Sequence, residues 1–267
     1  MKTPLSQSNP FNQTVRLEQA YVWERLNKLF IKKGPLRILD YGTYDGQMLQ
    51  IIANTGIIDS AIGVDVNVSA IESTPLQNSL VTLQVVSKGK PLPFPDECFD
   101  VVTLVGVLEH IHRQDLVLAE LNRVLSNDGK LLISVPRQHL FSFLDLGNLK
   151  FRFPRIHRKY FIYRNSEEDY IRRYVEGQNG LIGDVEIEKH WHEHFTQNKL
   201  EALLAEAGFM VLKQDGFGYF FRVFHNLHHL SPIFKKALHN LMLRDMFAFE
   251  KSELFVECEK AKWDKTW

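Results

Sequence analysis

One short stretch, residues 36–49, constrains the fold more than any other part of this 267-residue chain. It is an apolar strand that ends at Asp40, then a turn with Gly42 and Gly46, then the start of a helix. Glycine permits close backbone approaches, and the first N–H groups of a helix point back towards the turn. Ligands of open α/β sheets bind at such strand ends. The stretch therefore predicts a cradle for a cofactor.

The spacing of the glycines narrows the choice of cofactor. A dinucleotide fold requires Gly-x-Gly-x-x-Gly, but Tyr44 and Gln47 stand at two of its three glycine positions, so an NAD-dependent dehydrogenase fits poorly. The next expected strand, 61–65, also ends in an acid. Asp65 lies 19 positions after Gly46, close to the ~20 at which such folds place a carboxylate on ribose hydroxyls.

Alternating strand and helix patterns predict a doubly wound α/β sheet, and apolar runs such as 99–105 are typical of strands buried on both faces. Strands are expected at 36–40, 61–65, 80–86, 99–105, 130–135, 209–213 and 253–258, and helices at 15–33, 46–54, 114–125 and 197–207. We expect one domain over 1–267. Its additions are an N-terminal arm and helix over 1–35 and two substrate-side insertions, 137–193 and 217–250.

The composition argues against several classes of function. Thirty-two basic and 32 acidic residues balance, so the protein as a whole has no field that attracts nucleic acid or acidic membranes. Cys98 and Cys258 are too few for a disulfide framework or a cysteine-rich zinc site, and they fit a reducing compartment. No run approaches the ~20 apolar residues of a spanning helix, and the start lacks the apolar core of a signal peptide. We expect a soluble, cytoplasmic protein that binds no nucleic acid.

The first motif resembles that of class I S-adenosylmethionine-dependent methyltransferases, in which an apolar strand ends in Asp-x-Gly-x-Gly-x-Gly. Asp40, Gly42 and Gly46 match this pattern, and Tyr44 replaces its middle glycine. The segments similar to the family's fourth-strand signature and to the lead into its fifth strand are 92–100, 107–111 and 121–130. The likeness, to the type 11-like methyltransferase domain in particular, covers roughly residues 36–136 and 191–260.

This resemblance implies a Rossmann-like methyltransferase fold with a seven-stranded, mostly parallel sheet and an antiparallel last strand. It implies S-adenosylmethionine as methyl donor, S-adenosylhomocysteine as product, and a small-molecule, glycan or lipid-linked acceptor. The cofactor contacts that it implies are Asp40, Gly42, Thr43, Tyr44, Gly46, Asp65, Val66, Ser87, Val105 and Gly106. Family members often carry an Asp that bonds the adenine amino group before the Leu-Pro-Phe segment, and here that region reads Ser-Lys-Gly-Lys at 87–90. Adenine would then be held by backbone, by Ser87 or by apolar walls such as Val66.

The missing adenine acid and Tyr44 also leave an alternative open. A non-catalytic methyltransferase-like module would keep the fold and use the insertions to bind a partner or ligand. Glu109 and His110, just after the fourth strand, are the candidate catalytic residues of an enzyme. A histidine there can act as a general base on a hydroxyl, because its ordinary pKa lies near ~6.5. It can equally be a structural histidine that holds the loop, since in-line alignment supplies much of the rate of methyl transfer.

Histidines alternate at 190, 192 and 194 around Glu193, a pattern that could hold zinc on one strand face. We favour substrate contact or plain structure instead and expect no metal. The histidines predicted to contact substrate are His139, His192 and His194.

Two segments have an unusual composition. Residues 150–173 contain eight Lys or Arg and three acids, interleaved with aromatic residues. Arg155, Arg158 and Arg164 are predicted to meet an anionic group on the acceptor, and a solvated insertion is the alternative. Residues 217–249 carry helical aromatic patterns that fit a lid, a dimer face, membrane contact or packing onto the sheet. Both segments are candidates for peripheral membrane contact and for a mobile cover over the crevice.

Overall fold

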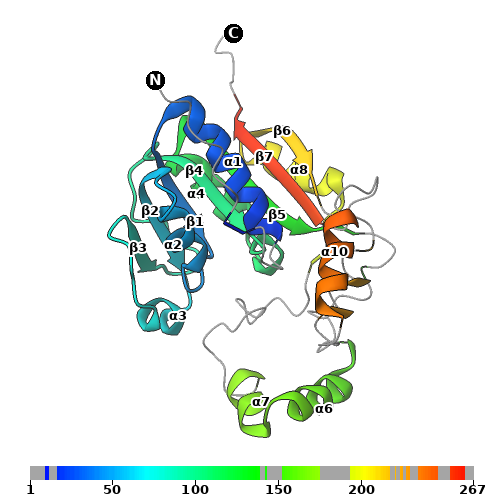
Figure 1. Ribbon diagram of the computed structural model, residues 1–267. Coiled ribbons are helices and arrows are strands. Elements are labelled where there is room, and N and C mark those ends of the chain that lie inside the picture. The colour runs from blue at the N-terminus through cyan, green and yellow to red at the C-terminus, as the bar shows by residue number, and fades with distance from the viewer. Residues whose placement is uncertain are drawn as a thin grey trace.

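The computed structural model describes residues 10–11, 17–138, 142, 152–174, 193–216, 220, 223–224, 227–228, 234–245 and 253–261. A single seven-stranded sheet with the order β3-β2-β1-β4-β5-β7-β6 runs through its centre (Figure 1). The strands are β1 (Leu36–Tyr41), β2 (Ile58–Asp65), β3 (Val81–Val85), β4 (Phe99–Val105), β5 (Leu125–Pro136), β6 (Phe209–Asp215) and β7 (Glu253–Lys260).

The directions of the strands confirm the predicted fold class. The pairs β1–β2, β1–β4, β2–β3 and β4–β5 are parallel, whereas β7 runs antiparallel to both β5 and β6. In register, Asp40 stands beside Gly63 of β2 on one side and Thr103 of β4 on the other. The carboxyl ends of these neighbouring strands therefore meet at one edge of the sheet, where ligands of such folds bind.

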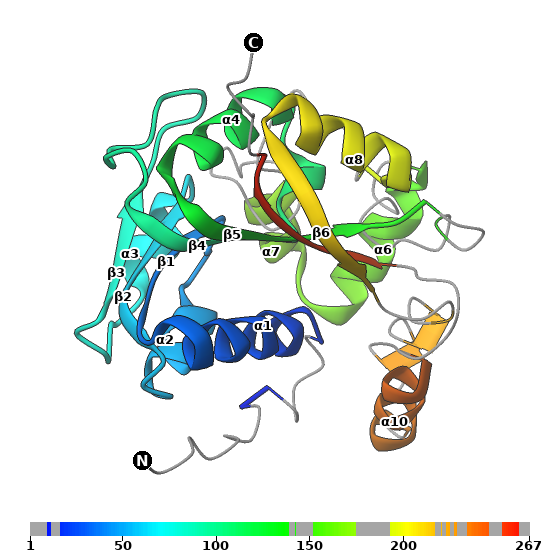
Figure 2. The same cartoon turned by 90° about the horizontal axis from the view of Figure 1, so that it is seen from above.

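Helices cover both faces of the sheet. The helices of the described residues are α1 (Leu17–Lys33), α2 (Gln47–Ala53), α3 (Val68–Ser73), the 3₁₀ turn η1 (Leu108–His110), α4 (Gln114–Val124), α6 (Pro154–Arg164), α7 (Glu167–Tyr174), α8 (Gln197–Glu206) and α10 (Lys235–Asp245). Figure 2 shows α1 and α2 below the sheet and α4 and α8 above it. Two apolar clusters follow from this arrangement. One contains Val22 and Leu26 of α1, and the other contains Leu118 of α4 and Leu200 of α8.

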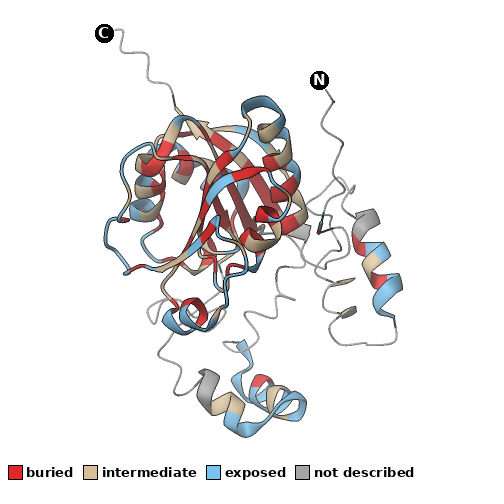
Figure 3. Cartoon of the chain, turned by 60° about the vertical axis from the view of Figure 1, so that its left-hand side comes forward, coloured by how far each residue is buried: buried red, intermediate tan, exposed pale blue. Residues whose placement is uncertain are grey.

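The sequence pattern explains these layers. In α4 the residues Leu118, Leu121 and Val124 recur three apart and are fully buried, so a single stripe of this helix faces the sheet. Thr196 accepts a hydrogen bond from the N–H of Lys199 and caps the start of α8. Burial is concentrated in the strands and on the inward sides of these helices (Figure 3).

Helices α6 and α7 lie apart from the two layers, and neither apolar cluster contains a residue of theirs (Figure 3). They pack on each other: the ring of Tyr170 lies 5.9 Å from that of His157 and 5.8 Å from that of Phe161. Arg158 donates to Glu167 at 2.7 Å across the same contact. We call α6 and α7 together the hairpin. Part of the first insertion is thus a small helical unit of its own.

The second insertion is helical where the structure describes it. Helix α10 buries Leu238 and Met242 but leaves Phe234, just before it, 61% exposed. Figure 1 shows α10 beyond the start of β7, next to the end of β5, and not over a face of the sheet. Whether the segment 217–249 packs onto the sheet stays a prediction, because part of it lies outside the described residues.

Most expected elements have observed boundaries within a few residues of those predicted. Two strands begin earlier than expected, at Ile58 and Leu125, where the sequence shows polar residues typical of turns. Each early start has a partner in the sheet: Leu36 pairs with Ile58, and Phe99 pairs with Leu125 through a local irregularity. Backbone pairing with a neighbouring strand outweighs the local turn signal at these positions.

Candidate functional site

Asp40 closes β1 as a buried carboxyl, with 4% of its surface exposed. The hydroxyl of Thr103 on β4 donates to its Oδ1 at 2.6 Å. Burial, which disfavours the charged form, raises the pKa of Asp40 from 3.8 to about 6, although the Thr103 hydrogen bond works in the opposite direction. A cation that binds near this carboxyl would favour its ionised form and lower its pKa.

Two positions in the turn after Asp40 have room for glycine only. Gly42 has a φ of +83°, and a Cβ at this residue would lie 2.3 Å from Cγ2 of Val107. Gly46 precedes α2 with a φ of +62°, and a Cβ there would lie 2.6 Å from Cδ2 of Leu83. Both positions combine a left-handed backbone with close packing, which is where glycine is required. The local sequence therefore fixes the shape of the cradle.

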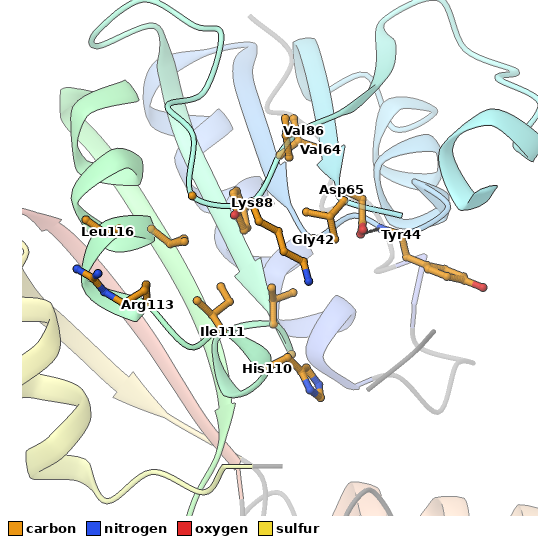
Figure 4. A pocket seen from close by; sticks show the side chains of 16 residues that line it. Gly42, Tyr44, Val64, Asp65, Val86, Lys88, His110, Ile111, Arg113 and Leu116 are labelled. Atoms are coloured by element: carbon orange, nitrogen blue, oxygen red, sulfur yellow. Dashed lines mark hydrogen bonds between the residues drawn. The ribbon is translucent and has the colours of Figure 1, made fainter. Parts of the chain in front are cut away.

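Tyr44 adopts a left-handed backbone without being a glycine, with a φ of +55°. Such a conformation costs an L-residue roughly 1–2 kcal/mol. Its N–H donates to Oδ2 of Asp65 at 2.8 Å, a charge-assisted bond that offsets part of this cost. The ring points away from the pocket at its rim (Figure 4). The replacement of the middle glycine of the motif thus leaves the turn intact and adds an aromatic edge.

Asp65 is oriented by two backbone donors. Besides the N–H of Tyr44 at its Oδ2, its Oδ1 accepts from the N–H of Asn67 at 2.9 Å. Helix α3 is capped by Asn67, whose side chain accepts from the N–H of Ala70 at 3.1 Å. Asp65 is therefore not the cap of this helix. Its carboxylate instead links the cradle turn to the end of β2.

Two pockets of different character meet at the cradle. The first, which we call the apolar pocket, is bounded by Val64, Val66, Val86, Ile111, Leu116 and Val117, with Asp65 at its side (Figure 4). The second, the acidic pocket, is lined by the carboxyl groups of Glu18, Asp40, Asp45, Glu109 and Glu253, and the described residues of its lining include no Lys or Arg. Both share the walls formed by Gly42, Tyr44, Gly106 and Val107.

Glu109 and His110 divide between the two pockets. Glu109 is 4% exposed and lines the acidic pocket, whereas His110 lines the apolar pocket, and 4.0 Å separates Nε2 of His110 from Oε1 of Glu109. Gly106, which precedes them with a φ of +64°, is anchored because its N–H donates to Oγ of Ser134 at 3.1 Å. The end of β4 is thus tied to β5, and this places η1 between the pockets.

The structure brings most of the predicted cofactor contacts to these pockets. Asp65 and Val66 line the apolar pocket. Asp40, Thr43 and Val105 line the acidic pocket. Gly42, Tyr44 and Gly106 line both pockets. Gly46 lines neither, since it is buried under Leu83 at the start of α2, and Ser87 lines a neighbouring hollow.

The predicted substrate residues lie elsewhere or are not described. Arg155, Arg158 and Arg164 belong to α6, and neither pocket at the cradle has them in its lining. Arg158 is engaged within the hairpin, paired with Glu167 and 5.8 Å from the centre of the Tyr170 ring. His139, His190 and His192 lie outside the described residues.

His194 is described, and it directly precedes a segment that joins the sheet. The next residue, Phe195, is fully buried, and its N–H donates to the carbonyl of Pro136 at 2.8 Å. Glu193 accepts from Nε2 of Gln114 at 2.9 Å and from the ammonium of Lys199. Within the described ranges, no group of three or more His, Cys, Asp or Glu side chains is arranged to hold a metal ion.

The loop between β3 and β4 is pinned to α4. Arg123 donates to the carbonyls of Phe94 at 2.8 Å and Leu92 at 3.1 Å, and it pairs with Glu120 at 2.7 Å. Glu120 in turn accepts from the N–H of Leu92 at 2.5 Å. The part of the loop that directly follows Lys88 and Gly89, two residues of the apolar pocket, is therefore held by α4.

Several pocket residues were not among the predicted contacts. Lys88 lines the apolar pocket, and Ser134, Glu18 and Glu253 line the acidic pocket. Lys88 belongs to a segment that the sequence had already marked by its missing acid. Glu18 and Glu253 come from α1 and β7, far apart in sequence, and no local pattern connects them to the cradle.

Comparisons with known proteins agree with this geometry. Residues 15–214 match the family model described as a methyltransferase domain. Curated relatives include ubiquinone/menaquinone biosynthesis C-methyltransferases UbiE. The one from Paraburkholderia xenovorans is 38% identical over 58 residues, which are 22% of this chain and 24% of the relative. The one from Burkholderia mallei is 30% identical over 102 residues, 33% of this chain and 42% of the relative. The chain thus spans less than half the length of these relatives.

Solved structures share the fold at low identity. An S-adenosylmethionine-dependent methyltransferase from Mesorhizobium loti has a TM-score of 0.52 and 15% identity, with 89% of this chain and 97% of that one covered. The [4+2]-cyclase SpnF has a TM-score of 0.55 and 16% identity, with 91% and 82% covered. At this identity the likeness concerns the fold alone.

Proposed function

We propose, because the chain belongs to the family of methyltransferase domains, that the protein transfers a methyl group from S-adenosylmethionine to an acceptor. The observation that carries this proposal is the pair of pockets that share the walls Gly42, Tyr44, Gly106 and Val107. One pocket is apolar with a single oriented carboxylate, and the other is lined by carboxyl groups. S-adenosylmethionine has matching parts, a nucleoside and a methionine end whose ammonium, sulfonium and carboxylate give it a net positive charge.

The residues present fit both ends of this cofactor. Val64, Val66 and Val86 offer apolar walls to a base. Asp65, already aligned by two N–H donors, offers its remaining lone pairs to the ribose hydroxyls. On the other side, an ammonium and a sulfonium gain from the surrounding carboxylates, because attraction between opposite charges is stronger in a partly buried site than in water.

When bound, S-adenosylmethionine supplies an electrophilic methyl group. The chain's own residues then have three tasks. The glycine turn admits the cofactor closely, the carboxyl groups of the acidic pocket orient its charged end, and η1 presents His110 and Glu109 at the junction of the pockets. We assign His110 the role of accepting a proton from the methyl acceptor. Glu109 would stabilise the positive charge that His110 then carries. Alignment of the acceptor supplies much of the rate.

For the acceptor we propose a small-molecule, glycan or lipid-linked compound. The relatives are named as C-methyltransferases of ubiquinone/menaquinone biosynthesis, which supports an acceptor of that general kind. We place the protein in the cytoplasm, where its two free thiols, Cys98 and Cys258, would stay reduced. Among the described residues, no helix has the length and apolar character needed to cross a bilayer.

The hairpin supports a further part of the proposal, peripheral contact with an anionic membrane surface through 150–173, aided by 217–249. Phe153, Ile156, Tyr160 and Tyr163 recur at spacings of three and four, so they share one face of α6. They are 53%, 59%, 39% and 86% exposed. The basic side chains exposed on the same helix include Arg155 and Lys159, and α6 has no acid. Aromatic and basic residues together are what an interfacial helix uses on anionic lipid.

Titration calorimetry with S-adenosylhomocysteine tests the cofactor site. Removing a charge-assisted partner of the ribose costs roughly 1.5–3 kcal/mol, so Asp65→Ala should weaken binding by about 10- to 100-fold. Asp65→Asn, which keeps an acceptor for one N–H, separates loss of binding from loss of the turn. Asp59→Ala is the matched control, because Asp59 is an exposed acid at the other end of the same strand.

Two results would contradict the proposal. Absence of S-adenosylhomocysteine binding by the intact protein would end it, and equal effects of Asp59→Ala and Asp65→Ala would remove the assigned site. A non-catalytic module differs in one observable. It would bind the cofactor but form no S-adenosylhomocysteine from S-adenosylmethionine when purified protein is given cell extract.

A further inference from the structure

Lys88 places a cation inside the apolar pocket. It lies in the turn after β3, and Figure 4 shows its side chain extending into the pocket. The other strongly charged groups of this lining are already engaged. Both oxygens of Asp65 accept backbone N–H groups, and Arg113 forms a two-point pair with Asp115 at 3.0 and 2.7 Å. Among the residues that the structure describes, Lys88 has no hydrogen-bond or ion-pair partner. Its ammonium is available for a ligand.

The backbone around Lys88 is anchored on both sides, so the fold sets the point from which its exposed side chain extends. Before it, the N–H of Val86 donates to the carbonyl of Asp65 at 2.9 Å. After it, Gly89 turns the chain with a φ of +66°, and Leu92 is held by Glu120 on α4. Asp65 and Lys88 thus stand on adjoining parts of one pocket wall. If Asp65 meets the ribose, Lys88 is positioned for the base.

The chemistry of an ammonium group restricts what it can recognise. Lysine donates hydrogen bonds and accepts none. The 6-amino group of adenine is also a donor, so Lys88 cannot pair with it, and only acceptor atoms of the purine remain as partners. A carboxylate in the same place would do the reverse: it would require the amino group and repel a carbonyl oxygen.

We propose that Lys88 reads acceptor atoms of the purine, so the site tolerates a 6-oxo purine in place of adenine. This inference rests on the proposed function, since it takes the apolar pocket to be the nucleoside end of the cofactor site. It assigns Lys88 as a residue that determines base specificity. The ligand class is an S-nucleosyl-homocysteine whose purine carries either an amino or an oxo group at position 6.

The test compares the affinities of S-adenosylhomocysteine and S-inosylhomocysteine by titration calorimetry. Their purines differ at position 6 and at N1, which is an acceptor in adenine and carries a hydrogen in hypoxanthine, but N3 and N7 are acceptors in both. The wild-type protein should bind the two within about threefold of each other, because the ammonium of Lys88 finds an acceptor on either purine. Lys88→Asp should bind the inosyl compound at least about tenfold more weakly than the adenosyl compound, since a carboxylate faces a carbonyl oxygen. Lys88→Ala should weaken both ligands together.

Lys90→Asp is the matched control. It makes the same change of charge in the same loop, but Lys90 lines the neighbouring hollow and not the apolar pocket. Its ratio of affinities should equal that of the wild type. Strong rejection of the inosyl compound by the wild type, or an unchanged ratio in Lys88→Asp, overturns the inference alone. If the wild type binds neither compound, the proposed function is overturned as well.

Discussion

At the scale of single residues, Asp40 combines a structural cost with a proposed role in binding. Its pKa is raised from 3.8 to about 6, mainly by burial. The native protein therefore binds a proton at Asp40 more tightly than the unfolded chain does. Stability from this group is fully present at low pH and falls as the pH rises between about 4 and 6. Above pH 6 the ionised, buried carboxylate opposes folding.

Asp40→Asn should remove this cost, because the amide keeps an acceptor for the Thr103 hydroxyl but carries no charge. We expect the free energy of unfolding at pH 7.5 to rise by on the order of 1–3 kcal/mol, with little change at pH 4. The variant should also bind S-adenosylhomocysteine more weakly, because a charge that faces the ligand's ammonium is gone. Urea unfolding at both pH values and calorimetry measure the two effects.

Asp100 serves as a control, because its pKa is shifted in the opposite direction from that of Asp40. Burial raises its pKa, but the Arg37 side chain and backbone outweigh this and hold the pKa below the usual range. Its contribution to stability is present above about pH 4 and is lost as the pH falls. Asp100→Asn should therefore destabilise the protein at pH 7.5. A gain in stability from both variants, or from neither, would contradict this account of Asp40.

At the scale of elements, the two-point grip of Arg123 on the loop before β4 explains how the apolar pocket keeps its rim. Arg123→Ala should lower the free energy of unfolding by about 1–3 kcal/mol, because the carbonyls of Leu92 and Phe94 lose a charged donor. It should also weaken S-adenosylhomocysteine binding through the loosened 87–90 segment. Urea unfolding and calorimetry are the measurements.

Arg113→Ala is the comparison for stability, since Arg113 sits in a fully exposed pair with Asp115. Exposed pairs contribute little, so this variant should unfold nearly as the wild type does. Arg123→Lys keeps the charge but not the planar fork and should fall between wild type and Arg123→Ala. If Arg123→Ala is as stable as Arg113→Ala, the contacts of Arg123 are not what holds the loop between β3 and β4 in place.

The elements also show what sequence could and could not predict. Strands such as β4 were predictable because a nearly continuous apolar run of this length is typical of a strand buried on both faces of a parallel sheet. The turn at Gly42 and Gly46 was predictable because its backbone and packing leave no alternative residue. The early start of β5 was not, because Leu125 pairs with Phe99 only once the sheet exists.

The candidate site divides in the same way. Asp40 and Asp65 were found because each ends a strand whose place in the sheet follows from local pattern. Glu18 and Glu253 were not found, because only long-range packing brings α1 and β7 to the acidic pocket. The sequence marked the segment around Lys88 only by the acid that it lacks. The structure was needed to show that the side chain of Lys88 lines the apolar pocket.

At the scale of the whole molecule, the hairpin and the sheet are separate in their packing. Replacing residues 150–173 by a short Gly-Ser linker should leave S-adenosylhomocysteine affinity within about threefold of the wild type, because no cradle contact is lost. Methyl transfer and co-sedimentation with anionic vesicles should both be abolished. Calorimetry, product mass spectrometry and sedimentation with anionic and neutral vesicles measure these outcomes.

Point variants sharpen this experiment. Ile156→Asp with Tyr163→Asp should reduce vesicle binding while leaving the hairpin folded, since both side chains are exposed. Met210→Asp on β6 is the control, because it adds a charge at another exposed apolar position. Unfolding or loss of cofactor binding in the linker variant would show that the segment is part of the core. Equal sedimentation of all variants would refute membrane contact.

The order of the last two strands has a consequence for how the protein is made. Within the described part of the chain, β6 pairs with β7 alone, and β7 follows it by more than thirty residues and inserts between β6 and β5. On the ribosome, β3, β2, β1, β4 and β5 can assemble while synthesis continues, but β6 must wait for β7 to emerge. Until then Phe209 of β6 and the apolar side of α8 have no completed sheet to cover. Because exposed apolar surface and unpaired strand edges promote aggregation, we expect the nascent chain to be most prone to aggregate during this interval.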